Sequence, residues 1–272
     1  MMTNYPILYA FTLIKDEQRY LDEWIEHNLR IGFNKIVLYE DYCSAPHDVS
    51  KYGDKVILLK TPECYDDEEK IMFYEHTPRQ HIVYDHFNRV YRNECDWFCF
   101  IDVDEFIETD NVKGLIDENY DQLVMFFRYY SYSGHINDPY PNQVYSIVET
   151  YKDVLPDDTT HKIEHLGFVW KSIHRSSSNL IAAKTKYACS VPHCSLYITN
   201  KKSKCLDTRI AHYWTRSLEE YIDKLFKQGL LENEPWSRKL SDFFVYNDLE
   251  MHDYIKYIKD YVKLTPKTNE DY

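Results

Sequence analysis

The stretch from Trp97 to Glu108, WFCFIDVDEFIE, constrains the fold more than any other part of the chain. Its first five residues are aromatic, β-branched or otherwise apolar, which predicts a short strand, Trp97 to Ile101, buried on both faces. Acidic residues begin where this strand ends. In an open α/β sheet the ligand crevice lies outside the carboxyl ends of the strands, so these acids are well placed for chemistry.

Asp102 and Asp104 are separated by a single residue in this stretch. On an extended chain, side chains two residues apart point to the same side, so the two carboxylates are predicted to converge on one cation. Mg²⁺ and Mn²⁺ take such oxygen ligands, together with water and substrate phosphates. An isolated DxD is equally compatible with a solvated acidic turn. An EF-hand is excluded, because Ile107 and Lys113 stand where that loop needs glycine and glutamate.

The first half of the chain alternates predicted strands with predicted helices. Strands are expected at residues 7–14, 35–39, 56–60 and 97–101, and helices from about Asp16 to Gly32 and from Pro78 to about Glu94. This alternation predicts right-handed crossovers and a mainly parallel sheet flanked by helices, which is an α/β fold.

The carboxyl ends of these strands bring further polar residues to one edge of the sheet, where we expect a nucleotide. Lys15 and Asp16 follow the first strand, and Asp41 follows the second as a candidate acceptor of a hydrogen bond from a base or ribose. Arg79 and Gln80 are candidates for the rim. An ordinary polar residue at a strand end remains an alternative for each. Neither GxGxxG nor GxxxxGK[ST] occurs in the sequence, which disfavours a dinucleotide fold and a P-loop.

Charge and cysteine content narrow the class of partner. The 272 residues include 32 Lys and Arg against 45 Asp and Glu, a net charge of −13, so nucleic acid is an unfavourable partner. The seven cysteines form no CxxC, which indicates neither a disulfide framework nor a zinc site. With no signal peptide and no run of about 18 apolar residues, a cytoplasmic protein with at most peripheral membrane association is expected.

The second half of the chain changes character at Leu123. Short strands are predicted at 123–129 and about 143–152, and helices at about 217–228 and within 236–264. The aromatic cluster here suits the apolar faces of sugars, so this half is expected to bind a saccharide. Its members are Tyr129, Tyr130, Tyr132 and His135.

Four blocks of the sequence, in order between about residues 7 and 229, resemble the glycosyltransferase family 2-like and family 92 group of GT-A enzymes. The blocks are IKDEQRYLDEWIEHNLRIGFNKIVLYEDYCS, RQHIVYDHFNRVYRNECDWFCFIDVDEFIE, FFRYYSYSGH and IAHYWTRSLEEYIDKLFKQG. The family usually has asparagine in a KNE motif where Asp16 stands in KDE. The resemblance implies a single GT-A domain over 1–272, with a nucleotide-sugar half (1–110), an acceptor half (111–230) and a helical extension (231–272).

The resemblance also implies roles for individual residues. Asp104 would bind the metal directly, and Asp102 would reach the ribose or the metal's waters. His212, in AHYW, would be a late ligand that completes the metal-diphosphate site, although a satisfied core histidine is the alternative. Lys171 belongs to a basic block, WKSIHR, that would neutralise phosphate or contact the acceptor, with a plain strand as the alternative.

The expected activity is therefore transfer of a sugar from a nucleoside diphosphate sugar, with UDP-sugar as the expected donor and a saccharide or glycolipid as acceptor. Mn²⁺ or Mg²⁺ would stabilise the leaving diphosphate. The resemblance implies inversion, which needs a general base; Asp138, Asp158 and Glu164 are candidates among which no spacing selects. A nucleotidyltransferase and a non-catalytic nucleotide-sugar binding module are the alternatives.

Overall fold

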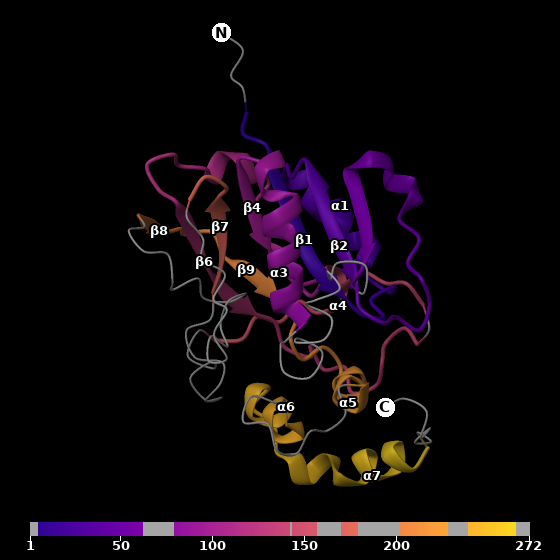
Figure 1. The fold of residues 1–272 in the computed structure, drawn as a ribbon. Coiled ribbons are helices and arrows are strands. Elements are labelled where there is room, and N and C mark those ends of the chain that lie inside the picture. Colours follow the sequence, from indigo (N-terminus) through magenta and orange to yellow (C-terminus); the bar gives the residue numbers. More distant parts are fainter. Residues whose placement is uncertain are drawn as a thin grey trace. The chain divides into compact units, whose positions relative to one another are not determined.

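A computed structural model describes residues 5–61, 79–141, 143–156, 170–178, 202–227 and 239–264. Its first four strands are parallel and lie in the order β3-β2-β1-β4. Figure 1 labels three of them, β2, β1 and β4, side by side. The four strands are β1 (Leu8–Ile14), β2 (Lys35–Glu40), β3 (Val56–Lys60) and β4 (Trp97–Phe100). Phe11 pairs with Val37 on one side and Phe100 on the other, so the carboxyl ends meet at one edge. The predicted α/β fold with a mainly parallel sheet is confirmed.

Beyond β4 the strand pairs β4–β7, β7–β6 and β9–β5 are antiparallel, whereas β8 runs parallel to β6. The full order is β3-β2-β1-β4-β7-β6-β9-β5, with β8 paired to β6. The added strands are β5 (Glu105–Ile107), β6 (Gln122–Tyr129), β7 (Trp170–Arg175), β8 (Ser203–Cys205) and β9 (Ile210–His212). The predicted strand at 123–129 is confirmed as β6. The antiparallel pairing of β5 with β9 places His212 opposite the acidic stretch, because β5 begins inside that stretch.

Two helices pack on the parallel strands. Helix α1 (Leu21–Ile31) buries Leu21, Trp24 and Ile25, and ends at Gly32, whose φ of 115° is the left-handed conformation that glycine adopts easily. The helix starts at Leu21 rather than near residue 16, since Asp16 is itself left-handed at φ 55° and cannot continue a helix.

Helix α3 (Arg79–Val90) lies in front of the parallel strands in Figure 1. Its aromatic side chains belong to the core that it forms with these strands. The ring of Phe87 stacks on that of Phe11, with centroids 4.0 Å apart and planes inclined by 8°. This aromatic core also includes Tyr9, Val37, Tyr39, Val83, Tyr84, Phe98 and Phe100. It holds β1 and β4 side by side and so positions the acids that follow β4.

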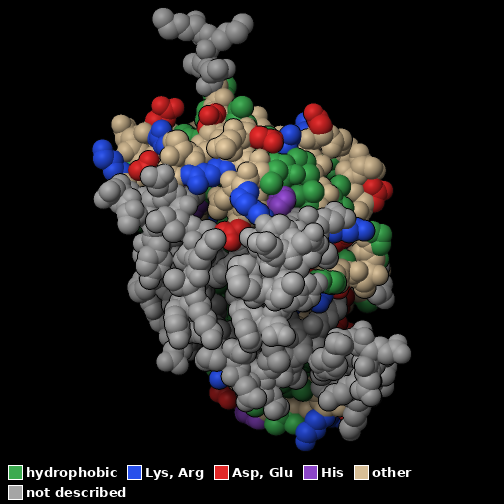
Figure 2. Space-filling view, in the orientation of Figure 1, with side chains coloured by type: hydrophobic (Ala, Val, Ile, Leu, Met, Phe, Trp, Pro, Cys, Tyr) green, Lys and Arg blue, Asp and Glu red, His purple; other side chains and the backbone are tan. Residues whose placement is uncertain are grey.

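The chain forms two compact units. The first unit comprises Met1–Phe127 and Val169–His212, and the second comprises Arg128–Phe168 and Tyr213–Tyr272. Short 3-10 helices of the first unit are η1 (Ser50–Lys55), η3 (Arg92–Glu94) and η4 (Val112–Leu115). On the face drawn in Figure 2, acidic and basic side chains of the described residues are interspersed rather than gathered by sign.

The second unit is helical. It contains α4 (Ile147–Thr150), α5 (Leu218–Lys227), α6 (Leu240–Tyr246), η7 (Met251–Tyr254) and α7 (Ile255–Leu264). The predicted helix at 217–228 is confirmed as α5. No helix among the described residues is both long and apolar enough to cross a membrane.

Two predictions for the second unit are wrong in detail. The strand expected at 143–152 contains helix α4, which begins because the Ser146 hydroxyl accepts a hydrogen bond of 3.0 Å from the Glu149 amide. The helical region within 236–264 is broken at Asn247, whose side-chain oxygen accepts from the Tyr132 amide at 3.1 Å while its nitrogen donates to Phe243.

Candidate metal centre

The acidic stretch turns immediately after β4. The Glu105 amide donates to the Asp102 carbonyl at 3.0 Å, and the Asp102 amide donates to Glu105 Oε2 at 2.9 Å. Residues 102–104 are therefore not extended, and the premise that strand alternation places Asp102 and Asp104 on one side is wrong. The turn instead delivers Glu105 to the start of β5.

Three buried side chains meet beside this turn. Glu105 pairs directly with His212 across the antiparallel strands β5 and β9, which places their side chains on the same face. Asp104 joins them, with its Oδ1 3.8 Å from His212 Nε2. One potential ligand atom from each of the three residues lies within 4.8 Å of the others, and all three residues are at most 7% exposed. Sequence reasoning expected Asp104 and His212 here but gave Glu105 no such role.

The chemistry of this group suits a divalent cation. Two carboxylates and an imidazole form a donor set that Mn²⁺ accepts readily. Glu105 Oε1 is buried and has no hydrogen-bond partner among the described residues. A buried acceptor without a partner costs about 1–3 kcal/mol, which a bound cation would remove. The residues present therefore fit a metal ion held by Asp104, Glu105 and His212.

Lys171 supplies an internal positive charge to the same turn. Its fully buried ammonium lies 2.9 Å from Asp102 Oδ2 and 3.2 Å from Glu105 Oε2, and 4.5 Å from the centre of the Phe100 ring. Asp102 and Asp104 thus have different neighbours, since the first pairs with Lys171 and the second lies beside His212. The Lys171 side chain neutralises protein carboxylates within the fold.

Burial and charge perturb the titration of this pair. Burial raises the pKa of Glu105 well above its ordinary value, against the opposing effect of Lys171, and the nearby acids Asp102 and Asp104 raise it further. Burial by itself lowers the pKa of Lys171, but the carboxylates of Asp102 and Glu105 outweigh this and raise it. The ammonium is therefore held in its charged form.

The other predicted nucleotide-binding residues lie at the carboxyl edge or at the start of α3. Lys15 is exposed, and Asp16 Oδ1 accepts two hydrogen bonds of 2.7 Å from the Ser44 amide and hydroxyl. Asp41 is buried and accepts from the Thr61 hydroxyl at 3.1 Å. Arg79 begins α3, and Gln80 follows it, half-buried.

The basic residues of the block at 171–175 lie at opposite ends of strand β7. His174 packs against Phe98 with ring centroids 5.5 Å apart, and the Arg175 guanidinium lies 4.9 Å from the Trp97 ring centre. Because Trp97 is at the amino end of β4, these residues lie at the opposite end of the strand from Asp102. Only Lys171 of this block reaches the acidic turn.

The candidate general bases are placed differently. Asp138 is among the residues that the structure describes, and it is half-buried. Its backbone amide donates to Glu219 Oε2 at 2.6 Å within the second unit. Asp158 and Glu164 lie outside the described residues.

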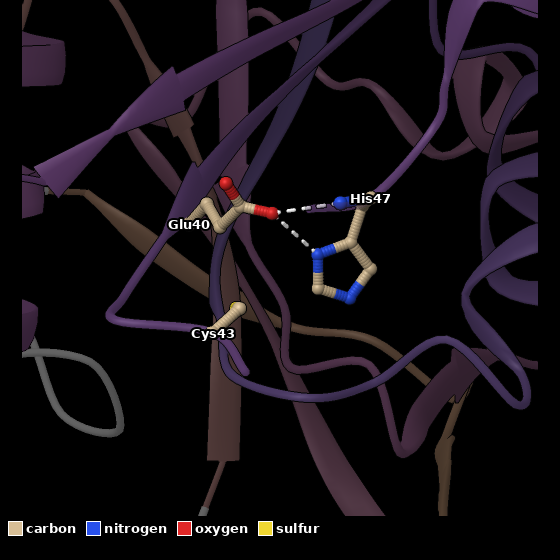
Figure 3. Close-up of side chains that lie close together, drawn as sticks. All are labelled: Glu40, Cys43 and His47. Atoms are coloured by element: carbon tan, nitrogen blue, oxygen red, sulfur yellow. Dashed lines mark hydrogen bonds and ion pairs between the residues drawn. The ribbon is translucent and has the colours of Figure 1, made fainter. Parts of the chain in front are cut away.

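A second group of potential metal ligands, Glu40, Cys43 and His47, follows β2 (Figure 3). The absence of a CxxC motif gives no indication of this group, because it contains a single cysteine. The signal present was the spacing ExxCxxxH directly at a strand end.

No protein-family model and no curated protein sequence matches the chain. Among solved structures, S. aureus TarS aligns with a TM-score of 0.43 and 12% identity over 96% of this chain and 49% of TarS. The mannosyltransferase PcManGT from Pyrobaculum calidifontis, in complex with GDP-Man and Mn²⁺, aligns with a TM-score of 0.32 and 14% identity over 46% of this chain and 37% of PcManGT. A mycobacterial protein aligns with a TM-score of 0.33 and 9% identity over 48% of this chain and 43% of that protein. The chain spans about half the length of TarS.

Proposed function

We propose that this chain is a metal-dependent glycosyltransferase of the GT-A type that uses a nucleoside diphosphate sugar, with UDP-sugar as the expected donor. The observation that carries the proposal is the convergence of Asp104, Glu105 and His212 at the carboxyl end of a central parallel strand. Ligands of α/β sheets bind outside these strand ends, and the donor set is one that can hold a cation against a diphosphate.

A bound divalent ion would act as a Lewis acid that stabilises the negative charge developing on the leaving diphosphate. The chain's own residues prepare this site. Asp104, Glu105 and His212 supply the ligands, while Lys171 holds the turn by pairing with Asp102 and Glu105. The resulting geometry is set before substrate arrives, which is the condition for effective electrostatic catalysis.

The donor nucleotide is proposed to lie along the carboxyl edge of the sheet. Asp16 and Asp41 stand at the ends of β1 and β2, and both anchor backbone or hydroxyl groups of neighbouring loops. They would shape the base and ribose pocket, with Lys15, Arg79 and Gln80 around it. This assigns nucleotide-sugar binding to residues 1–110.

The acceptor is proposed to be a saccharide or glycolipid bound by residues 111–230. Tyr130 and Tyr132 of this region are half-buried and would contact a sugar face, whereas Tyr129 is buried in the core. The transfer is proposed to invert the anomeric centre, with a general base taking the acceptor hydroxyl proton. Asp138 is the described candidate for that base.

The test is calorimetric titration of UDP with and without Mn²⁺ on the wild type, Asp104→Ala and Asp110→Ala. Asp110 is a matched control, because its fully exposed carboxylate pairs only loosely with Arg30, at 3.5 Å. We expect metal-dependent binding to weaken by on the order of 100-fold in Asp104→Ala and to persist in Asp110→Ala.

The donor class is checked by extending the titration to GDP, CDP and dTDP, followed by hydrolysis of the matching sugar nucleotides. Binding of another nucleotide in place of UDP would correct the donor base alone. Failure of all four diphosphates to bind the wild type with Mn²⁺ or Mg²⁺ would overturn the proposed function.

A further inference from the structure

The loop that follows β2 gathers three different ligand types. Glu40 is the last residue of β2, Cys43 follows three residues later and His47 four residues after that. One potential ligand atom of each lies within 4.8 Å of the others. Figure 3 shows the His47 ring turned towards the Glu40 carboxylate, with Cys43 on the same loop.

Hydrogen bonds hold this group in a defined state. Glu40 Oε1 accepts from both the backbone amide and Nδ1 of His47, at 2.9 and 2.7 Å. Because Nδ1 carries the proton, Nε2 is the acceptor, and it receives the Glu17 amide at 3.3 Å. Glu40 and His47 are at most 7% exposed. These contacts fix the imidazole in the tautomer that carries its proton on Nδ1.

Cys43 is oriented towards the end of β1. Its Sγ accepts from the Asp16 amide at 3.4 Å and donates to the Ile14 carbonyl at 3.7 Å. Backbone amides that donate to sulfur also stabilise a thiolate, the form of cysteine that binds metals. The loop is thus tied to β1 through the same atoms that could ligate an ion.

The geometry points to a second cation site, formed by Glu40, Cys43 and His47, that binds a borderline transition ion of the Zn²⁺ class. One sulfur, one nitrogen and one oxygen favour such an ion over Mg²⁺, and the three- and four-residue spacings match the short ligand loops of zinc sites. Three protein ligands leave a fourth position for water. This site shares no ligand with the group Asp104, Glu105 and His212.

Ion binding requires a small, defined rearrangement. Two ligand atoms at about 2.0–2.1 Å from a tetrahedral ion are about 3.3 Å apart, so the Nδ1 to Oε1 pair must open by about 0.6 Å from 2.7 Å. The Cys43 thiol releases its proton to solvent. The His47 proton moves from Nδ1 to Nε2, so the Glu17 amide, which donates to Nε2 in the ion-free loop, must turn away from it.

Cobalt substitution tests the site directly. Metal-stripped protein is titrated with Co²⁺, whose thiolate complexes absorb in the near ultraviolet, and Zn²⁺ content is measured after dialysis. We expect a thiolate-to-cobalt band in the wild type, and in Cys43→Ser the loss of this band together with one equivalent of bound Zn²⁺ relative to the wild type. Cys205→Ser, which alters an exposed cysteine, and Asp104→Ala should retain both.

His47→Ala is a second variant, expected to weaken Zn²⁺ binding by on the order of 100-fold, with circular dichroism to verify folding. Should it fail to fold, the spectrum of the wild type and the effect of Cys43→Ser still decide the question. Absence of the band in wild type, or a band unchanged by Cys43→Ser, would show that the cluster is a hydrogen-bonded loop anchor only and overturn the proposal.

Discussion

Single residues set the charge balance of the candidate metal centre. Lys171 and Glu105 have fully buried side chains, and Asp102 is one-quarter exposed. Taking such charges out of water is costly, and the cost is recovered only while each retains its partner. The pairing therefore makes the turn sensitive to loss of Lys171 in a way that a surface ion pair is not.

Lys171→Met tests this balance, because methionine keeps most of the volume and removes the charge. We expect a loss of about 3–5 kcal/mol in the free energy of unfolding, measured by urea denaturation. Lys204→Met is the matched control: the Lys204 side chain is 42% exposed and pairs with Asp117 at 3.0 Å, so its loss should cost at most about 1 kcal/mol. Equal costs for the two variants would contradict the buried pairing.

At the scale of elements, helix α1 is fixed to the strand that begins at the acidic turn. Trp24 Nε1 donates to the Glu105 carbonyl at 3.1 Å, and one turn later His27 Nε2 contacts the Ile107 carbonyl at the same distance. Arg30 donates to His27 Nδ1 at 3.0 Å, so the proton of the neutral ring is on Nε2. Burial, with a further effect of Arg30, lowers the pKa of His27 to about 4.

This shift predicts a pH dependence of stability. The unfolded chain takes up the His27 proton near its ordinary pKa of 6.5, whereas the folded chain resists until about 4. Stability should therefore fall as pH falls through this window, by at most about 3 kcal/mol. Urea unfolding at several pH values should show a shallower slope for His27→Gln. His252→Gln, at an exposed site, should keep the wild-type slope; an unchanged slope in both would refute the assignment.

Local sequence predicts much of this fold, and the prediction fails at two identifiable places. Apolar runs locate β1 to β4, and Gly32 correctly marks the end of α1. The start of α1 was misplaced because Asp16 is held in a left-handed conformation by Ser44, which is 28 residues away. In 147–150 the β-branched residues favoured a strand, although the Ser146 and Glu149 pair was a local sign of a helix start.

The candidate site shows the same division. The position of the acids at a strand end follows from residues 97–105 alone, but their partners do not. Lys171 is 69 residues from Asp102, and His212 reaches Glu105 only through strand pairing. Residues 102–105 form a turn, whereas the prediction from alternating side chains assumes an extended strand. For this reason the sequence did not predict Glu105 as a metal ligand.

At the scale of the whole molecule, the chain passes between its two units at residues 127, 168 and 212, so neither unit is one continuous segment. Helix α6 belongs to the core of the second unit. Phe243 lies 5.4 Å from Tyr221 and 5.7 Å from Tyr132, and Tyr246 lies 5.1 Å from Trp214, as ring centroid distances. Helices α5 and α6 therefore contribute buried rings to the core of the second unit, and we expect its stability to depend on them.

Phe243→Ala tests whether the second unit can lose stability without the first. Removing this fully buried ring is expected to cost about 3–5 kcal/mol, and Val245→Ala, on the same helix but exposed, should stay within about 0.5 kcal/mol. If each unit opens cooperatively, hydrogen exchange in Phe243→Ala accelerates in peptides from 128–141, 143–156, 213–227 and 239–264 while β1 and β4 keep their protection. Equal acceleration in β1 and β4 would mean instead that the molecule unfolds as one cooperative unit.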